Sequence, residues 1–263
     1  MAPHLANWIL ILLSFFLKLQ GSYGSGGDQE DQNLAAHKMG FLGMDDIYVG
    51  NTITINLPFD DPSSSPHFIP REEADSLPFS SSNLQSILDL FSIPQGSPHA
   101  KAMQDTIRRC ETLPMEGEAK TCANSLESLL DYVNTAFGQN SNVKALTTTH
   151  DAMSTGNSNK YRILEVKEIP IRKMMGCHVM RWPYAVYYCH HQMDNSETKV
   201  FNILLGGDDD GDKLDAFAAC HMDTSKRDPN QLVFKLLNTM PGRSSPVCHV
   251  FPEGDLIWVD PIF

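Results

Sequence analysis

The sequence has 263 residues, of which 41% are apolar, and it carries a formal net charge of −12. This length and apolar content are enough for one sizeable packed domain. The acidic balance, without clusters of Lys or Arg, argues against binding to nucleic acid, to anionic lipid or directly to a polyanionic polysaccharide.

The N-terminus has the pattern of a secretory signal peptide. An apolar run of ten residues, Trp8–Leu17, is too short to span a bilayer, and small residues follow it at Gly21–Gly27. We therefore predict a signal peptide at 1–24 and a secreted protein of the cell wall, extracellular space or vacuole. A membrane-anchoring N-terminal helix is the alternative. A short polar leader, 25–40, is expected to be disordered, and the mature protein should have no membrane segment.

The first part of the following domain is predicted to be mainly helical. Apolar residues alternate from Ile53 to Phe59, which predicts one strand. Three helices should follow, and their boundaries are marked by a capping box at Ser82–Gln85, a Ser97-Pro98 start, and a stop at Gly138. The third of these helices is predicted to begin early enough to carry Cys122.

The second part has the composition of antiparallel strands. Short β-branched and aromatic runs, bounded by Gly, Pro and Asp, are YRILEV, YAVYYC, KVFNILL, AFAAC, LVFKLL, PVCHVF and LIWV. Six cysteines in a secreted chain are expected to be oxidised. We predict an α+β fold at 41–263, with a helical N-terminal half packed on a disulfide-stabilised antiparallel β region.

Four of the six cysteines are followed directly by histidine, at Cys177-His178, Cys189-His190, Cys220-His221 and Cys248-His249. Successive side chains on a strand point to opposite faces, so the thiol and the imidazole of one pair cannot form a catalytic dyad. We expect the four cysteines to face the interior and the four histidines to converge on the other side.

The disulfide pairing is predicted only in part. Cys110 and Cys122 should be joined, because a short segment with Pro and Gly lets the chain turn back between them. The remaining four cysteines should pair among themselves. Proximity favours Cys177–Cys189 with Cys220–Cys248, but all three connectivities stay open.

Four converging imidazoles predict a metal site at His178, His190, His221 and His249. Neutral imidazoles bind Zn, Cu and Ni, and Cu(II) is favoured among divalent ions. A Cys₂His₂ zinc site fits neither the spacing nor an oxidising compartment. His191 is left out, because it should point to the cysteine side. Binding should weaken as the pH falls through about 6.5. Four ordinary structural histidines are the alternative.

The spacing of these pairs, with 10, 29 and 26 residues between successive dipeptides, resembles the signature of the plant BURP domain family. The resemblance extends over most of the mature chain, and blocks such as PYAVYYCH, CHMDTS and SPVCHVFP carry it. The short leader is most similar to the unknown-seed-protein branch of that family. The resemblance implies a plant origin, passage through the secretory route and an α+β fold held by disulfides.

In family members that act as peptide cyclases, the histidines of the Cys-His pairs bind copper, and a Tyr or Trp side chain is joined oxidatively to a nearby residue of a core peptide. In this sequence, the positions that match those copper ligands are His178, His190, His221 and His249. This sequence departs from the pattern at two positions, because Arg227 stands where the family usually has Trp and Gln231 where it usually has His. The acidic run Gly206–Asp212 also lengthens one gap, and we interpret it as a solvated turn.

A fused cyclase also needs a core peptide, and the leader region offers only the aromatic residues Tyr23 and Phe41, with Tyr48 just inside the domain. The tyrosines Tyr184, Tyr187 and Tyr188 are expected to pack rather than to become cross-linked. The leading interpretation is therefore a non-catalytic, secreted BURP-domain protein with a developmental or stress-related role and histidine-based copper binding. The alternatives are a copper-dependent peptide cyclase and an accessory subunit of a cell-wall polysaccharide enzyme, with a peptide or cell-wall partner.

Overall fold

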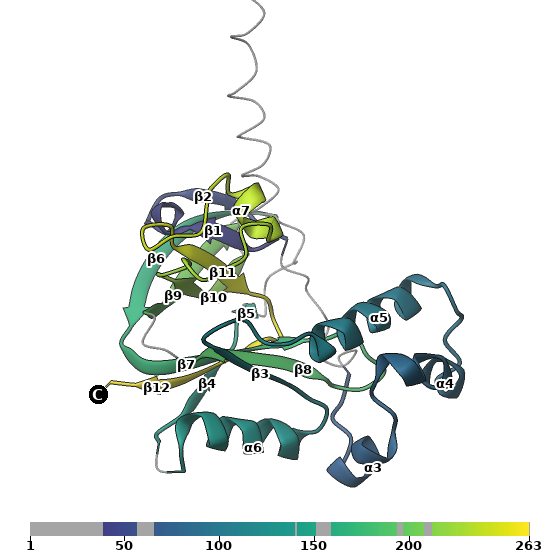
Figure 1. The fold of residues 1–263 in the computed structure, drawn as a ribbon. Helices are drawn as coiled ribbons and strands as arrows, with labels where there is room; N and C mark the ends of the chain where they lie inside the picture. Colours follow the sequence, from purple (N-terminus) through teal and green to yellow (C-terminus); the bar gives the residue numbers. More distant parts are fainter. Residues whose placement is uncertain are drawn as a thin grey trace, which may run out of the picture.

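The structure is a computed structural model that describes residues 39–56, 66–139, 141–150, 159–193, 197–207 and 212–262. The predicted signal peptide, most of the leader and the centre of the acidic run lie outside the described residues. Two antiparallel sheets and a group of helices make up the described part (Figure 1).

The larger sheet has the order β1-β11-β10-β9-β6-β2, with β5 paired to β10, and the smaller sheet has the order β3-β8-β7-β12-β4. The strands are β1 Phe41–Gly43, β2 Thr52–Thr54, β3 Glu118–Ala123, β4 Lys144–Leu146, β5 Thr149–His150, β6 Lys160–Ile169, β7 Ile171–Val179, β8 Tyr187–Gln192, β9 Thr198–Gly207, β10 Lys213–His221, β11 Val247–Phe251 and β12 Leu256–Pro261.

The helices lie mostly between the second and third strands of the chain. They are η1 Met44–Asp46, α3 Arg71–Ser76, η3 Ser81–Asn83, α4 Leu84–Leu90, α5 Pro98–Glu111, α6 Leu126–Phe137 and α7 Leu232–Leu236. The predicted start of α5 is confirmed, because the Ser97 hydroxyl accepts from the backbone N–H of Ala100 and Pro98 is the first helical residue. The predicted stop of α6 at Gly138 is also confirmed.

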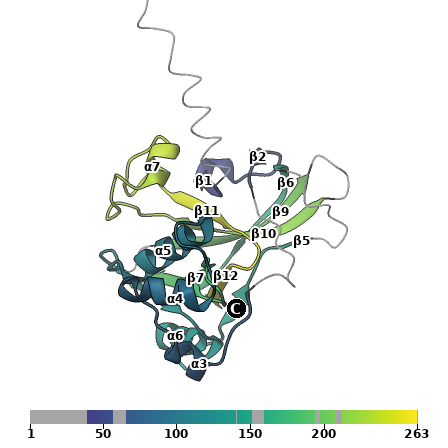
Figure 2. The same ribbon diagram turned by 90° about the vertical axis from the view of Figure 1, so that its right-hand side faces the viewer.

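The apolar core has several parts, each with a defined place. Leu42 of β1 and Ile53 of β2 belong to one cluster with the central strands of the larger sheet, so that sheet curls around its own core. A second cluster, with Val200, Phe251 and Ile257, contains residues of both sheets and joins them face to face. Helix α6 covers the outer face of the smaller sheet, as Figures 1 and 2 show. Every strand pair is antiparallel.

The fold prediction is confirmed in part, because the β region is antiparallel and carries disulfides, but a helical N-terminal half is not shown. Strands β1, β2 and β3 lie in this half beside the helices. Cys122 belongs to β3 and not to a helix, because β3 pairs with β8 and places Cys122 opposite Tyr188. A partner strand that is distant in the sequence overrides local helical spacing, and this pairing cannot be read from one segment alone.

The segment LVFKLL, predicted as a strand, forms helix α7. A short run of this kind, apolar except for Lys235, fits either a strand or a buried helical turn, so its periodicity does not distinguish them. The helix buries Phe234 and ends before Asn238, whose φ of 46° cannot continue it. The capping box at Ser82–Gln85 is replaced by η3, which leads directly into α4. No helix among the described residues has the length and apolarity needed to cross a bilayer.

Candidate functional site

The four Cys-His pairs lie in two equivalent pairs of strands. In the first, Cys177 of β7 lies directly opposite Cys189 of β8, and Gly176 lies opposite His190. In the second, Cys220 of β10 lies directly opposite Cys248 of β11, where Ala219 lies opposite His249. In each unit the two cysteines share one face of the sheet, and the two histidines share the other, diagonally across the strand pair.

Three disulfides connect these and the remaining cysteines: Cys110–Cys122, Cys177–Cys189 and Cys220–Cys248. This is the pairing that proximity favours, and no cysteine among the described residues is free. The two disulfides within the sheets lie in different cores. Cys177 and Cys189 pack against α6, whereas Cys220 and Cys248 lie inside the curled larger sheet.

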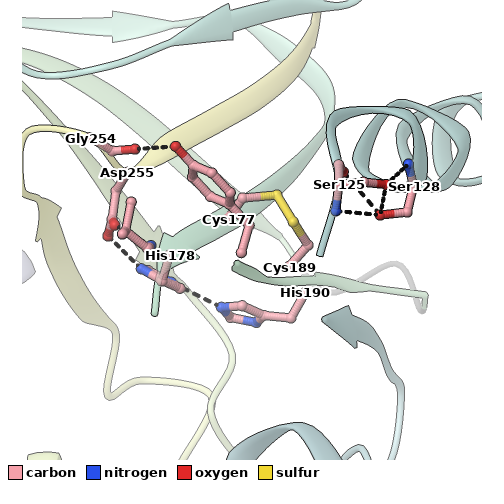
Figure 3. Close-up of a disulfide and its surroundings, with 10 residues drawn as sticks. Ser125, Ser128, Cys177, His178, Cys189, His190, Gly254 and Asp255 are labelled. Atoms are coloured by element: carbon pink, nitrogen blue, oxygen red, sulfur yellow. Dashed lines mark hydrogen bonds and ion pairs between the residues drawn. A yellow bond between two sulfur atoms is a disulfide. The ribbon is translucent and has the colours of Figure 1, made fainter. Parts of the chain in front are cut away.

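The predicted division between cysteines and histidines is therefore present. His191, which follows His190, lies on the cysteine side, with its ring 6.0 Å from that of Tyr132 on α6. Between the two sheets, the smaller one contributes His178 and His190, and the larger one contributes His221 and His249. Figure 3 shows the first unit, where the disulfide lies on one side of the strands and the two imidazoles on the other.

The four imidazoles form a closed ring of neighbours. The centroid distances are 5.5 Å for His178–His190, 6.4 Å for His190–His221, 5.7 Å for His221–His249 and 5.6 Å for His249–His178. Nitrogens about 2 Å from one tetrahedral metal ion would put neighbouring centroids about 5 Å apart. The centroid distances in the structure are longer than this. Accordingly, no group of three or more His, Cys, Asp or Glu side chains in the described part of the chain already has the geometry of a metal site.

Two buried carboxylates orient the histidines of the smaller sheet. His178 Nδ1 lies 2.7 Å from Asp255 Oδ2, and His190 Nδ1 lies 2.9 Å from Glu118 Oε1 (Figure 3 shows the first contact). Glu118 and Asp255 are only 3% and 5% exposed. An ionised carboxylate can only accept, so both Nδ1 atoms donate, and in a neutral imidazole the Nε2 atom then carries the lone pair. Carboxylates of this kind orient the histidine ligands of metal sites.

The aromatic ring of Phe251 lies against histidines of both sheets. Its centroid is 5.0 Å from that of His178, with nearly parallel rings, and 4.5 Å from that of His249. Gly176 makes room for this ring, because an added Cβ at Gly176 would lie 3.0 Å from Phe251 Cζ. Phe251 is fully buried and thus restricts how far these imidazoles can move.

Burial keeps three of the imidazoles neutral. It lowers the pKa of His190, although the hydrogen bond to Glu118 acts in the opposite direction. It lowers the pKa of His221 to about 3, with the charge of Arg227 as the next cause. It also lowers the pKa of His249 well below the ordinary value. For Glu118, burial raises the pKa, but the contacts with His190, Met115 and Arg227 outweigh it and the pKa is lowered overall.

One imidazole has an unsatisfied polar atom. The buried Nδ1 of His221 has no hydrogen-bond partner among the described residues. A buried polar atom without a partner costs free energy, and such atoms mark places where an ion or water is needed. The donor set of the cluster, four neutral imidazoles with two held by carboxylates, is thus the chemistry that a copper or zinc ion would take.

A pocket of about 570 Å³ opens above the four histidines, all of which line it. Its lining also includes the apolar residues Phe41, Leu232 and Pro252 and the polar residues Arg109, Arg227 and Gln231. A second pocket of about 450 Å³ shares Arg109 and Gln231 with the first and contains Tyr188. The four histidines therefore lie together on the lining of a pocket large enough to admit a side chain.

Several residues of the site were not found from the sequence. Glu118 and Asp255 contact histidines that lie 72 and 77 residues away, and nothing in their local pattern signals this. Phe251 follows His249 by two positions on β11, so strand alternation places them on one face, but its contact with His178 is not local. Arg227 and Gln231 were singled out, as departures from the BURP pattern, and both line the pocket. Of the three tyrosines, Tyr184 is buried as expected, whereas Tyr188 lies beside the cluster, 5.4 Å from the His190 ring.

The sequence comparisons agree with this geometry. The profile of the BURP domain family matches residues 40–260. The chain is 39% identical over 251 residues to BURP domain-containing protein BNM2A of Brassica napus, covering 89% of this chain and 88% of that one. It is 38% identical to BURP domain protein USPL1 of Arabidopsis thaliana, covering 83% and 79% of the two chains. BURP domain protein RD22 of Arabidopsis thaliana is 39% identical, with 73% and 47% covered. The chain belongs to the BURP domain family.

Proposed function

We propose that this protein is a secreted BURP-domain protein that binds one copper ion through His178, His190, His221 and His249, with a role in plant development or stress. The observation that carries the copper proposal is the gathering of all four imidazoles on the lining of one pocket. Bound copper would supply a redox-active Lewis acid, while the chain's own residues hold and orient the imidazoles.

Three features support this binding. Two of the histidines have their Nδ1 atoms held by buried carboxylates, which leaves Nε2 to face the cluster. The His221 Nδ1 atom lacks a partner among the described residues. The centroid distances exceed those of a coordinated set by about 1 Å, which rotation of the side chains can close.

Copper uptake by the purified mature protein tests the proposal. The parent should bind one Cu(II) per chain in calorimetry and retain it after desalting, as measured by elemental analysis. The double variant His178→Gln/His249→Gln should bind none. His191→Gln is the matched control, because His191 is on the same strand as His190 but faces α6. Equal copper uptake by the double variant and the parent would refute the proposal.

Secretion is part of the same proposal. Three disulfides are typical of proteins that fold in an oxidising compartment, and they support passage through the secretory route. N-terminal sequencing of protein recovered from plant apoplast or vacuole should begin within Gly21–Gly27. A fusion that stays in the cytosol, with its first residues intact, would contradict secretion. A developmental or stress role predicts a phenotype in a loss-of-function line during seed development or water deficit.

A copper-dependent peptide cyclase is the second candidate, and one observation favours it. The pocket lined by the histidines is large enough for an aromatic side chain, and both apolar and cationic side chains line it. Cyclisation would join a Tyr or Trp side chain to a neighbouring residue with the loss of two hydrogen atoms, whose electrons pass to dioxygen. Mass spectrometry of protein and added peptides after aerobic copper loading would detect the two-hydrogen loss. Unchanged masses would reject this candidate and leave copper binding intact.

A further inference from the structure

The charges around the histidine cluster are few and almost all buried. An imidazole binds a metal ion through the lone pair of its neutral form, so the four histidines add no charge to the ligand set. Behind the cluster lie the carboxylates of Glu118 and Asp255. In the described part of the chain, the cation that makes an ion-pair contact with one of these carboxylates is Arg227, whose side chain is 14% exposed and which lines the same pocket as the histidines.

The two carboxylates have different surroundings. Asp255 accepts hydrogen bonds from His178 Nδ1 and from the backbone N–H of Val179, and no cation lies beside it among the contacts of the described residues. Glu118 Oε1 is shared, because it lies 2.9 Å from His190 Nδ1 and 3.7 Å from Arg227 Nη1. The positive charge of Arg227 therefore offsets the negative charge that Glu118 would otherwise place behind His190.

Arg227 is held in this position from several sides. Its Nη1 atom contacts the sulfur of Met115 at 3.6 Å, and its Nη2 atom donates to the side-chain oxygen of Gln192 at 2.6 Å. Its backbone N–H donates to the carbonyl of Thr224. A long cation that is fixed in this way contributes a constant charge to the pocket, unlike Arg109, which lines the pocket but is exposed and screened by water.

The formal charge of this buried set is minus one, because two carboxylates are opposed by one guanidinium. A monovalent ion would make the set neutral, whereas a divalent ion would leave one positive charge uncompensated. An uncompensated charge that is removed from water is costly. Without Arg227 the set would carry two negative charges and would match a divalent ion instead.

We propose that Arg227 tunes the histidine cluster toward monovalent copper, Cu(I), by neutralising the carboxylate behind His190. Arg227 is a positioning residue here, since it acts through Glu118 and contacts no metal. The inference rests on the proposed copper binding and adds to it the charge state that the site prefers.

The test compares affinities for ions of different charge. Cu(II) affinity is measured by competition with a Cu(II) chelator, and Cu(I) affinity by competition with a Cu(I)-selective chelator under ascorbate without oxygen. In Arg227→Met, which has a similar length and no charge, Cu(II) should bind about tenfold more tightly or better. Cu(I) affinity should rise by only about the square root of that factor, roughly threefold for a tenfold gain, because the monovalent ion carries half the charge. Each tenfold difference corresponds to a fall of about 59 mV in the potential of the bound copper.

Redox-inert ions show whether a change in affinity depends on the charge of the ion or on its redox chemistry. Zn(II) affinity should rise in Arg227→Met as Cu(II) affinity does, and Ag(I) affinity should follow that of Cu(I). Arg227→Lys keeps the charge and should behave as the parent. Arg109→Met removes an exposed cation from the same pocket and should also behave as the parent. Arg227→Gln provides a second neutral variant if the methionine variant does not fold, as judged by circular dichroism and by the absence of free thiols.

Two results would overturn the inference alone. One is equal changes of monovalent and divalent affinity in the neutral variants, which would make Arg227 a structural residue. The other is a lysine variant that behaves as the neutral ones, which would make geometry and not charge the cause. A parent protein that takes up no copper in either state would overturn the proposed function, and this inference with it.

Discussion

The Nε2 atoms of His178 and His190 face one another at 3.4 Å, while both rings donate from Nδ1 to buried carboxylates. Two lone pairs at this distance repel unless a proton or a metal ion lies near them. The carboxylates thus hold two neighbouring imidazoles in the tautomer that suits a cation between them.

Replacing Asp255 with Asn should weaken copper binding through this tautomer. The Asn oxygen would still accept from Val179, but its amide N–H would face His178 Nδ1 and shift the ring proton to Nε2. We expect copper affinity to fall about 10- to 100-fold, the usual effect of removing such a partner. Asp260→Asn, which removes a carboxylate that pairs with Arg172, is the control for competition measurements. An Asp255→Asn protein with parental copper affinity would contradict this role.

The metal-free protein should lose stability as the pH falls. Burial lowers the pKa of His221 to about 3, so between that value and about 6.5 the unfolded chain binds a proton that the folded chain does not. Stability is therefore complete above about pH 6.5 and decreases toward pH 3, by about 2 kcal/mol between pH 7 and pH 5 from this residue. His190 and His249 act in the same direction.

Urea unfolding of the metal-free protein at pH 7, 6 and 5 measures this slope. His221→Gln should show a shallower decrease, because the titrating ring is absent. A free energy of unfolding that is constant or rises toward pH 5 in the parent would show that the histidines are not neutral and buried as described.

Replacing Gly176 with alanine should displace the ring of Phe251, which lies against His178 and His249. The Cβ of Ala would lie 3.0 Å from Phe251 Cζ and 3.6 Å from His178 Nε2, so Phe251 must shift against His249. Overpacking of this kind costs about 1–3 kcal/mol. Gly176→Ala should lower the free energy of unfolding by this amount and weaken copper binding. Gly242→Ala serves as a comparison for stability alone, because its φ is not positive and its added Cβ makes only ordinary van der Waals contacts, the nearest at 3.5 Å from Ser245 Oγ. Unchanged copper affinity in Gly176→Ala would show that Phe251 does not constrain the histidines.

Removing the Cys110–Cys122 disulfide should lower the stability of the protein without weakening its copper binding. This bond joins the end of α5 to β3 across a sequence separation of 12, and closing a loop of this size contributes about 3 kcal/mol in the chain-entropy treatment. The double variant Cys110→Ala/Cys122→Ala should lose this stability in chemical denaturation and keep its copper affinity within twofold. A large loss of copper binding would mean that β3 and Glu118 are displaced when the bond is absent.

The site could be predicted from the sequence to the extent that it depends on alternation along a strand. Each Cys-His dipeptide separates a thiol from an imidazole, and this alone predicted which residues gather and that His191 faces away. The carboxylates could not be predicted, because Glu118 reaches His190 only through the pairing of β3 with β8, and Asp255 reaches His178 from a turn 77 residues away.

The fold was predicted less completely for the same reason. Caps at Ser97 and Gly138 are local signals and were identified, whereas Cys122 was placed in a helix because its strand pairing is not local.

The ordinary imidazole pKa also predicted loss of metal near pH 6.5. Burial lowers the pKa of His190 and His221, so the structure moves the expected competition by protons to a lower pH.

In both strand pairs the two cysteines lie directly opposite one another. The positions of the imidazoles therefore do not depend on the length of the loop that joins the two strands. Each disulfide fixes which residues of its two strands lie opposite one another, and a slip of one residue would turn every histidine to the wrong face. The long connection between β10 and β11, which carries Arg227 and Leu232 into the pocket wall, begins and ends beside the Cys220–Cys248 bond. Insertions or substitutions in that connection can therefore alter what enters the pocket while the four imidazole rings stay in place.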